Sequence, residues 1–333
     1  MPKRFTFPVL AIVVALLIYT AYWFYARGQI VEYVEAWEAE QRAAGFQIEH
    51  SELRIGGFPY RFSVTTDSLV VRAPESEGGW RLALDRFEAN ALPYDFEHWI
   101  VSLGDRLELS ADGDGLAFAA DQARFSFSGE GGVTQRIGAS VEALAISGIG
   151  NTVPAVQSAA EMRLSAATSE TGELAVQLQL DDVILDPGEI DPILARSFGD
   201  RIALLQAAFT VSQWPTLANS ADLSIWSEAS GEYTLRAFHI DWGRLDMEAE
   251  GQIALDAQLR PTGRISLSLL DPEAIVDAMI ETGAISQENA GAMRLVAQSA
   301  PRSEDGTAIP LSFRNGGVYF GPVRLGDTGP ILF

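Results

Sequence analysis

One uncharged and almost wholly apolar run opens the chain, over residues 5–26. An α-helix rises about 1.5 Å per residue and about 20 residues cover the hydrocarbon core of a bilayer, so this run is long enough to span a membrane. The aromatic residues at its end, Tyr22 to Tyr25, are typical of a membrane interface. A cleaved signal peptide needs a shorter apolar core and small residues before the cleavage site. We therefore expect residues 1–26 to form a cytoplasmic tip and an uncleaved transmembrane signal anchor.

The charges on the two sides of this run predict its orientation. Lys3 and Arg4 precede it, whereas Glu32, Glu35 and Glu38 follow it. Basic residues stay on the cytoplasmic side of a membrane span, so the N-terminus is expected to be cytoplasmic. We therefore expect a single-pass protein of the bacterial inner membrane with its main domain in the periplasm.

The pattern of apolar residues changes twice after the anchor. A juxtamembrane helix is expected over residues 27–45, because Ile30, Val34 and Trp37 form one stripe and Gly45 stands where a left-handed cap ends a helix. From residue 46 on, apolar and polar positions alternate in short segments bounded by turn residues, which is typical of half-buried antiparallel strands. Such segments are 61–64, 80–84, 106–109, 116–119, 124–127, 174–180, 223–226, 233–238, 246–259 and 264–269. Asn315-Gly316 predicts a further hairpin.

Few helices are expected among these strands. Asp191-Pro192 and Asp271-Pro272 each place an N-cap acid before a proline, which predicts helices over 192–206 and 272–281. A third helix is expected from Ser286 to the break at Pro301. The fold class is therefore mainly β. An N-terminal transmembrane helix precedes a large curved antiparallel sheet, open and groove-like, with a few packed helices, and residues 46–333 form a β-rich periplasmic domain.

The charge balance excludes some partners. The chain has a net charge of −22, and since residues 1–26 contain only Lys3 and Arg4 as charged residues, residues 27–333 contain 21 basic and 45 acidic residues. Such a surface repels nucleic acid and anionic lipid headgroups, so no nucleic acid is expected as a partner and the helix alone is expected to bind the membrane. Cysteine is absent, which removes disulfides and thiol catalysis and is compatible with a periplasm.

The sequence shows no recognisable catalytic or metal motif. His50, His98 and His239 are the only histidines and none has the spacing of a metal site. The acidic cluster over residues 112–115 lacks an oxygen ligand at Leu116, so it is interpreted as a turn and not as a calcium loop. We therefore expect no cofactor, no metal and no enzyme, with a carboxylate-based glycan-acting enzyme as a reserve interpretation.

Apolar residues gather on one side of two neighbouring strands near the end of the chain. They are Ile253, Leu255, Leu259, Ile265, Leu267 and Leu269. The structural interpretation is that this side packs against helices or a second sheet. The functional interpretation is that it holds an apolar ligand, and the many strands and few helices favour an uncovered sheet.

Gly57, Phe58 and Pro59 are interpreted as a folding device. Gly56 and Gly57 allow a tight reversal, Phe58 is expected to fill the core, and Pro59 excludes a helix and starts a strand.

Two blocks of sequence resemble a known family. The block Gly56-Gly57-Phe58-Pro59-Tyr60-Arg61-Phe62 and the block from Pro310 to Pro322, with Trp37 and Trp80, are similar to the uncharacterised bacterial family called domain of unknown function 2125. The resemblance covers nearly the whole chain and implies a single-anchor, envelope-facing protein without an assigned activity. More distantly, the anchor and the β-rich part resemble AsmA-like envelope proteins, and that resemblance implies a curved sheet that carries phospholipid.

We therefore expect a membrane-anchored periplasmic protein that binds or carries an apolar ligand, a phospholipid, in envelope homeostasis. The alternative is a non-catalytic scaffold that binds an envelope protein partner.

Overall fold

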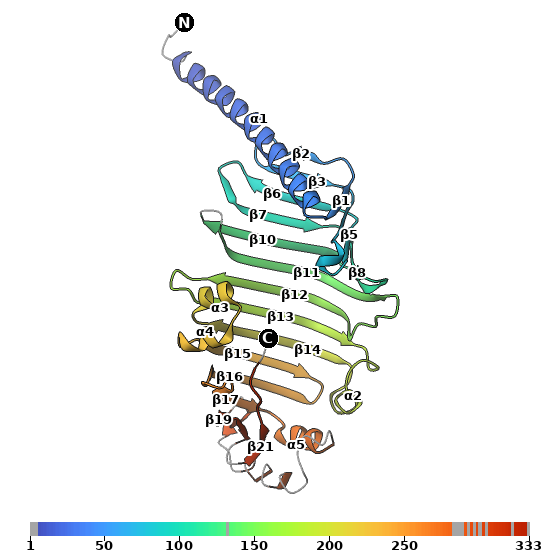
Figure 1. The fold of residues 1–333 in the computed structure, drawn as a ribbon, viewed down its shortest axis with the longest axis vertical. Helices are drawn as coiled ribbons and strands as arrows, with labels where there is room; N and C mark the ends of the chain where they lie inside the picture. Colours follow the sequence, from blue (N-terminus) through green and yellow to red (C-terminus); the bar gives the residue numbers. More distant parts are fainter. Residues whose placement is uncertain are drawn as a thin grey trace. The chain divides into compact units, whose positions relative to one another are not determined.

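The chain is mainly β, as predicted, with a long N-terminal apolar helix and few other helices (Figure 1). A computed structural model describes residues 6–130, 133–281, 290–291, 294–295, 298, 302–303, 306–320 and 323–331. The chain divides into two compact units. Unit 1 comprises Met1–Thr134 and Gly148–Thr152, and unit 2 comprises Gln135–Ser147 and Val153–Phe333.

The expected anchor and the expected juxtamembrane helix are one continuous helix, α1 (Thr6–Ala43), in unit 1. Its part from Leu10 is long and apolar enough to cross a membrane. The side chains from Leu10 to Ile18 are exposed, so the described rest of unit 1 does not cover this stretch. The helix ends as predicted: Gly45 has a φ of +97°, and the backbone N–H of Phe46 donates to the carbonyl of Gln41 at 3.0 Å.

Ten strands and one 3-10 turn lie wholly in the described part of unit 1. They are β1 (Gln47–His50), β2 (Arg54–Gly56), β3 (Phe62–Thr66), β4 (Leu69–Arg72), η1 (Glu75–Glu77), β5 (Arg81–Leu84), β6 (Phe87–Leu92), β7 (Asp95–Leu103), β8 (Arg106–Ala111), β9 (Asp114–Ala119) and β10 (Gln122–Glu130). All pairings among them are antiparallel, in two series: β1-β4-β5-β8-β9 and β2-β3-β6-β7-β10. The acidic cluster at 112–115 is the β8–β9 turn, as predicted, with positive φ at Asp112 and Gly113.

The core of unit 1 lies between α1 and the second series of strands. Phe62 is fully buried and its ring stacks on Trp23 of α1 at 5.0 Å. Ile55 and Val64 continue this core under Ile30. Burying aromatic rings of this size dominates the packing of a small core, so α1 is an integral part of unit 1 and not a detached anchor.

Unit 2 is one open run of antiparallel strands in chain order. Its strands are the central part of β11 (Val133–Ile149), β12 (Val156–Thr168), β13 (Leu174–Leu185), β14 (Arg201–Val211), β15 (Glu232–Trp242), β16 (Leu245–Leu255), β17 (Pro261–Leu269), β18 (Arg302–Ser303), β19 (Gly306–Arg314), β20 (Gly317–Phe320) and β21 (Val323–Asp327). The short strand β18 pairs with β19. Each of the other strands pairs with the next, and β17 pairs with β19. The Asn315-Gly316 hairpin joins β19 to β20 as predicted, with positive φ at both residues.

Four short helices of unit 2 are described over their whole length (Figure 1). They are α2 (Pro192–Phe198), α3 (Trp214–Ser220), α4 (Leu223–Glu228) and α5 (Pro272–Glu281). The helix predicted over 272–281 is confirmed by α5. The helix predicted over 192–206 begins as expected, with Asp191 accepting the N–H of Ile193 at 2.7 Å, but the prediction of its end was wrong. Gly199 ends α2, and β14 begins at Arg201.

Two predicted strands also need correction. Residues 223–226 belong to a helix, α4, whose N-cap is Asp222, a residue that accepts the N–H of Ser224 at 2.7 Å. The strand predicted over 246–259 ends at Leu255, because Asp256 folds the chain into a turn by accepting the N–H groups of Gln258 and Arg260. The helix predicted from Ser286 to Pro301 lies largely outside the described residues.

Candidate functional site

The sheet of unit 2 has one apolar side and one polar side. On β13 the side chains of Val176 and Leu178 face the apolar side, and Gln177 between them faces the polar side and is exposed. Residues directly opposite each other in antiparallel strands share a face, so the pairing of the strands extends this division across the sheet. Val176 is opposite Phe209 on β14, and Phe209 is opposite Leu235 on β15.

Three cross-strand rows therefore make up what we call the apolar face. They are Thr168, Leu174, Val211, Tyr233, Ile253, Gly263 and Phe313; Ala166, Val176, Phe209, Leu235, Gly251, Ile265 and Leu311; and Leu164, Leu178, Ala207, Phe238, Ala249, Leu267 and Ile309. All of these except Ala249 and Ile309 keep part of their surface open to solvent. These side chains are half-buried, and a continuous apolar surface that keeps contact with solvent is a candidate binding surface.

The apolar face is covered at the C-terminal end of β17, where α5 packs against it. Leu269 is 1% exposed and packs with Val276 of α5 and with Ile309. On neighbouring strands Val183 and Ile202 form a second buried cluster. The buried core of unit 2 is thus concentrated where β13, β15 and β17 end and α2 and α5 begin, and the three rows extend beyond it.

The six residues predicted as a ligand site are therefore divided among different environments. Ile253 and Ile265 lie in the rows of the apolar face with part of their surface exposed. Leu255 continues their side of β16 at the strand end, where Ser227 of α4 donates to its carbonyl at 3.1 Å. Leu267 packs against the core that contains Leu269.

Leu259 does not lie on a strand. It has a φ of +57° in the turn that Asp256 forms, so the prediction that it continues the strand face was wrong. Leu269 lies on the predicted face, but it is buried under α5 and has no surface left for a ligand.

Most of the apolar face was missed by the sequence reasoning. Val176, Phe209 and Leu235 lie in the same row as Ile265 although they are far from it in sequence. Their alternation with polar residues predicted strands, but the shared row depends on strand register, which a single sequence does not display.

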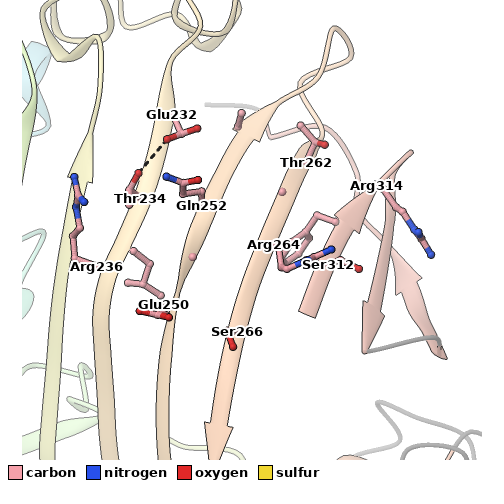
Figure 2. Close-up of a pocket in the computed structure, with 15 residues that line it drawn as sticks. Glu232, Thr234, Arg236, Glu250, Gln252, Thr262, Arg264, Ser266, Ser312 and Arg314 are labelled. Carbon is pink, nitrogen blue, oxygen red and sulfur yellow. Dashed lines mark hydrogen bonds between the residues drawn. The ribbon is translucent and has the colours of Figure 1, made fainter. Parts of the chain in front are cut away.

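The polar side of the same sheet carries a depression of about 860 Å³. Figure 2 shows the polar side chains of β15, β16, β17 and β19 along it, among them Arg236, Glu250 and Arg264. Thr234 donates to Glu232 at 3.2 Å. Leu235 and Phe313 of the apolar rows also border this hollow, but most of its side chains are polar or charged, so it suits a polar ligand or a charged segment of a protein.

Unit 1 contains a second hollow, of about 670 Å³, with a mainly apolar lining. Leu82, Leu109 and Leu116 form one cross-strand row in it on β5, β8 and β9, and Trp80 lies beside them. The side chain of Leu109 is 44% exposed, so an apolar group that entered the hollow would contact it directly. Pockets of this volume with apolar linings are typical of small-molecule and acyl-chain sites.

The motif Gly57, Phe58 and Pro59 forms a turn, as predicted, but Phe58 does not fill the core. The N–H groups of Tyr60 and Arg61 both donate to the carbonyl of Gly57 at 3.1 Å, and Gly57 has a φ of +98°. A Cβ at Gly57 would lie 2.6 Å from the carbonyl oxygen of Arg61, so only glycine fits. Phe58 is 47% exposed against Trp23 and Phe24, and the prediction that it is the core residue was wrong.

Two of the three histidines contact a nearby carboxylate. His50 of β1 contacts Glu38 of α1 at 2.8 Å, and His239 of β15 contacts Asp246 of β16 at 3.2 Å. Within the described residues, no three histidine or acidic side chains converge as metal ligands would. Burial raises the pKa of Tyr233 on the apolar face, which fits a phenol surrounded by apolar side chains.

A comparison with known protein families gives one match. A family model described as "Uncharacterized protein conserved in bacteria (DUF2125)" matches residues 23–328, which is nearly the whole chain. No curated protein matches the chain.

Proposed function

The chain belongs to the uncharacterised bacterial family DUF2125. Because the description of this family names no activity, we propose a function from the geometry of the chain. The protein is a single-pass protein of the inner membrane whose periplasmic part binds the acyl chains of phospholipid on the apolar face, in envelope homeostasis. The observation that carries the proposal is the set of three partly exposed apolar rows across the strands of unit 2.

Contact with the apolar face can stabilise a bound acyl chain. Burying one methylene gains about 0.8 kcal/mol, so about ten methylenes against these rows gain about 8 kcal/mol before the cost of ordering the chain. Such binding needs no catalytic group. The apolar hollow at Leu82, Leu109 and Leu116 in unit 1 offers the same chemistry at a second place.

Native mass spectrometry of the full-length protein with matched variants tests the proposal. Replacing Phe209 and Ile265 by serine puts two hydroxyl groups on the apolar face, and we expect the number of phospholipids that co-purify to fall. The control replaces Gln206 and Arg264, exposed residues of the polar side on the same two strands, by serine. Lipid held by α1 is the same in both variants, so equal lipid content would contradict the proposal.

A scaffold is the second candidate, and the polar depression favours it. Arg236, Arg264, Glu232 and Glu250 all line the depression, so the surface offers both signs of charge to the side chains of an envelope protein partner. Interfaces of this kind are sensitive to charge reversal. If the scaffold interpretation is right, Arg264→Glu abolishes the capture of a partner protein in cells while the lipid content of the protein stays unchanged.

A further inference from the structure

Two loops of unit 1 share an unusual sequence and an unusual environment. The first contains Phe58-Pro59-Tyr60 and the second contains Leu92-Pro93-Tyr94, so each is an apolar residue followed by proline and tyrosine. The first precedes β3 and the second joins β6 to β7. We call these two segments the Pro-Tyr loops.

Both Pro-Tyr loops are fastened to the same short stretch of α1. The hydroxyl of Tyr19 donates to the carbonyl of Pro59, and the hydroxyl of Tyr22 donates to the carbonyl of Pro93 at 2.7 Å. The indole N–H of Trp23 donates to the carbonyl of Arg61 at 3.3 Å, just after the first loop. The loops therefore lie at the level of residues 19–23 along the helix axis.

The apolar side chains of these loops are not used to build the core. Tyr60 and Tyr94 are each 82% exposed, and Phe58 and Leu92 are 47% and 41% exposed. From Gly56 to Tyr60 and from residue 90 to Tyr94 the chain has no charged residue, and Arg61 and Asp95 follow directly. The two loops thus present one basic and one acidic side chain beside their aromatic and apolar ones, which is little charge on a chain with 45 acidic residues, and such a surface repels lipid headgroups only weakly.

The position of this surface along α1 is close to the expected edge of the membrane. Residues 19 to 22 lie about 20–24 Å along the helix from Thr6, whereas the hydrocarbon core is about 30 Å thick. With Thr6 at one edge of that core, residues 19–22 lie within about 10 Å of the opposite edge, so the loops fastened to them lie at the membrane and not beyond it. Tyrosine prefers the headgroup region because its ring is apolar and its hydroxyl is polar.

We propose that the Pro-Tyr loops dock unit 1 onto the membrane that α1 spans, with the rings of Tyr60 and Tyr94 in the lipid headgroup region. The inference rests on the anchoring part of the proposed function. The partner is the phospholipid bilayer itself. The hydrogen bonds from Tyr19 and Tyr22 hold the loops at this depth, so unit 1 stands directly on the membrane surface and not at the end of a free stalk.

Site-specific fluorescence tests the inference, because the chain has no cysteine and each variant therefore carries one label. Tyr60→Cys and Tyr94→Cys change exposed side chains only, and Glu77→Cys in the exposed turn η1 is the control in the same unit. Leu16→Cys, 60% exposed in the apolar half of α1, reports the anchor. Each full-length variant is labelled with a nitrobenzoxadiazole dye and reconstituted into phosphatidylcholine vesicles that contain spin-labelled lipid.

We expect a headgroup spin label to quench the dye at positions 60 and 94 and to leave the dye at position 77 bright, while an acyl-chain spin label quenches position 16. Quenching at position 16 with positions 60 and 94 as bright as position 77 would overturn the docking inference and leave the anchor standing. A blue-shifted but unquenched dye at 60 and 94 would also overturn it, because a second copy of the chain then covers the loops. An unquenched dye at position 16 would overturn the anchor and the docking together.

Discussion

At the scale of single residues, neighbouring aromatic residues in one sequence block have opposite roles. Phe58 is half exposed beside α1, whereas Phe62, four residues later, is fully buried between Trp23 and Phe96, with ring separations of 5.0 and 5.4 Å. Nothing in the residues next to Phe58 and Phe62 indicates which of the two rings is buried. Burial here depends on where α1 lies, which local sequence does not specify.

The two residues give a matched prediction. Phe62→Ala removes a fully buried ring and is expected to lower the free energy of unfolding by about 3–5 kcal/mol. Phe58→Ala removes a ring that is half in water and is expected to cost about 1 kcal/mol. Denaturant unfolding of the two variants in the same detergent measures both values. Equal losses would contradict the placement of α1 against β3.

Asp256 gives a prediction about pH. Its carboxylate accepts the guanidinium Nε–H of Arg260 at 2.9 Å and the backbone N–H of Arg260 at 3.0 Å, and these hydrogen bonds hold the pKa of Asp256 below its usual value of 3.8. A carboxyl group with a lowered pKa in the folded state stabilises the fold above its unfolded pKa, and this contribution is lost as the pH falls through its folded pKa.

Asp256→Asn keeps one acceptor oxygen but has no charge to lose. We therefore expect wild type to have the higher Tm at neutral pH, and the difference in Tm between the two proteins to shrink as the pH falls below 3.8. Thermal melts of both proteins across this range are the measurement. A difference that stays constant with pH would show that the Arg260 contact does not stabilise the β16–β17 turn.

At the scale of elements, the alternation of apolar and polar residues predicted strands well where a segment was long. Residues 174–180 lie inside β13, and residues 264–269 lie inside β17. The four residues 223–226 were too few to distinguish a strand from a helix, and the cue that decides, Asp222 as an N-cap, was overlooked. The alternation of apolar and polar residues also did not predict that Ile265 is partly exposed and Leu269 buried. Leu269 is covered by α5, a helix that lies outside the strand.

The packing of α4 gives a prediction at this scale. Trp226 of α4 is 5% exposed and donates its indole N–H to the carbonyl of Ser212 at 2.7 Å. A Cβ at Gly231 would lie 2.1 Å from the ring of Trp226, so Gly231→Ala forces the ring away and is expected to cost about 1–3 kcal/mol. Gly326→Ala, where a Cβ meets nothing within 4 Å, is the control in the same unit. Tryptophan fluorescence with denaturant unfolding measures both, and equal stability of the two variants would contradict the packing.

At the scale of the whole molecule, the sequence predicted a long apolar helix followed by a mainly β chain, and both are confirmed. The candidate site was predicted only in part. Strand faces follow from local alternation, but the rows that join Val176, Phe209 and Ile265 follow from pairing between distant segments.

The proposed topology is testable with reporters fused to the full-length chain. Lys3 and Arg4 precede the apolar stretch and acidic residues follow it, so we expect residues 27–333 on the periplasmic side. An alkaline phosphatase fused after Phe333 should be active, because this enzyme needs the periplasm to form its disulfides. An inactive phosphatase, together with a fluorescent cytoplasmic reporter at the same site, would contradict the topology.

The most direct measurement for acyl-chain binding is photo-crosslinking in cells from neighbouring positions of one strand. Ile265 lies in the apolar face with part of its surface exposed, and Arg264, the residue before it on β17, is exposed on the polar side. With a photo-activatable amino acid at each position in turn, position 265 is predicted to capture phospholipid and position 264 to capture none. Capture of a protein at position 264 with no lipid at position 265 would contradict acyl-chain binding and favour the scaffold.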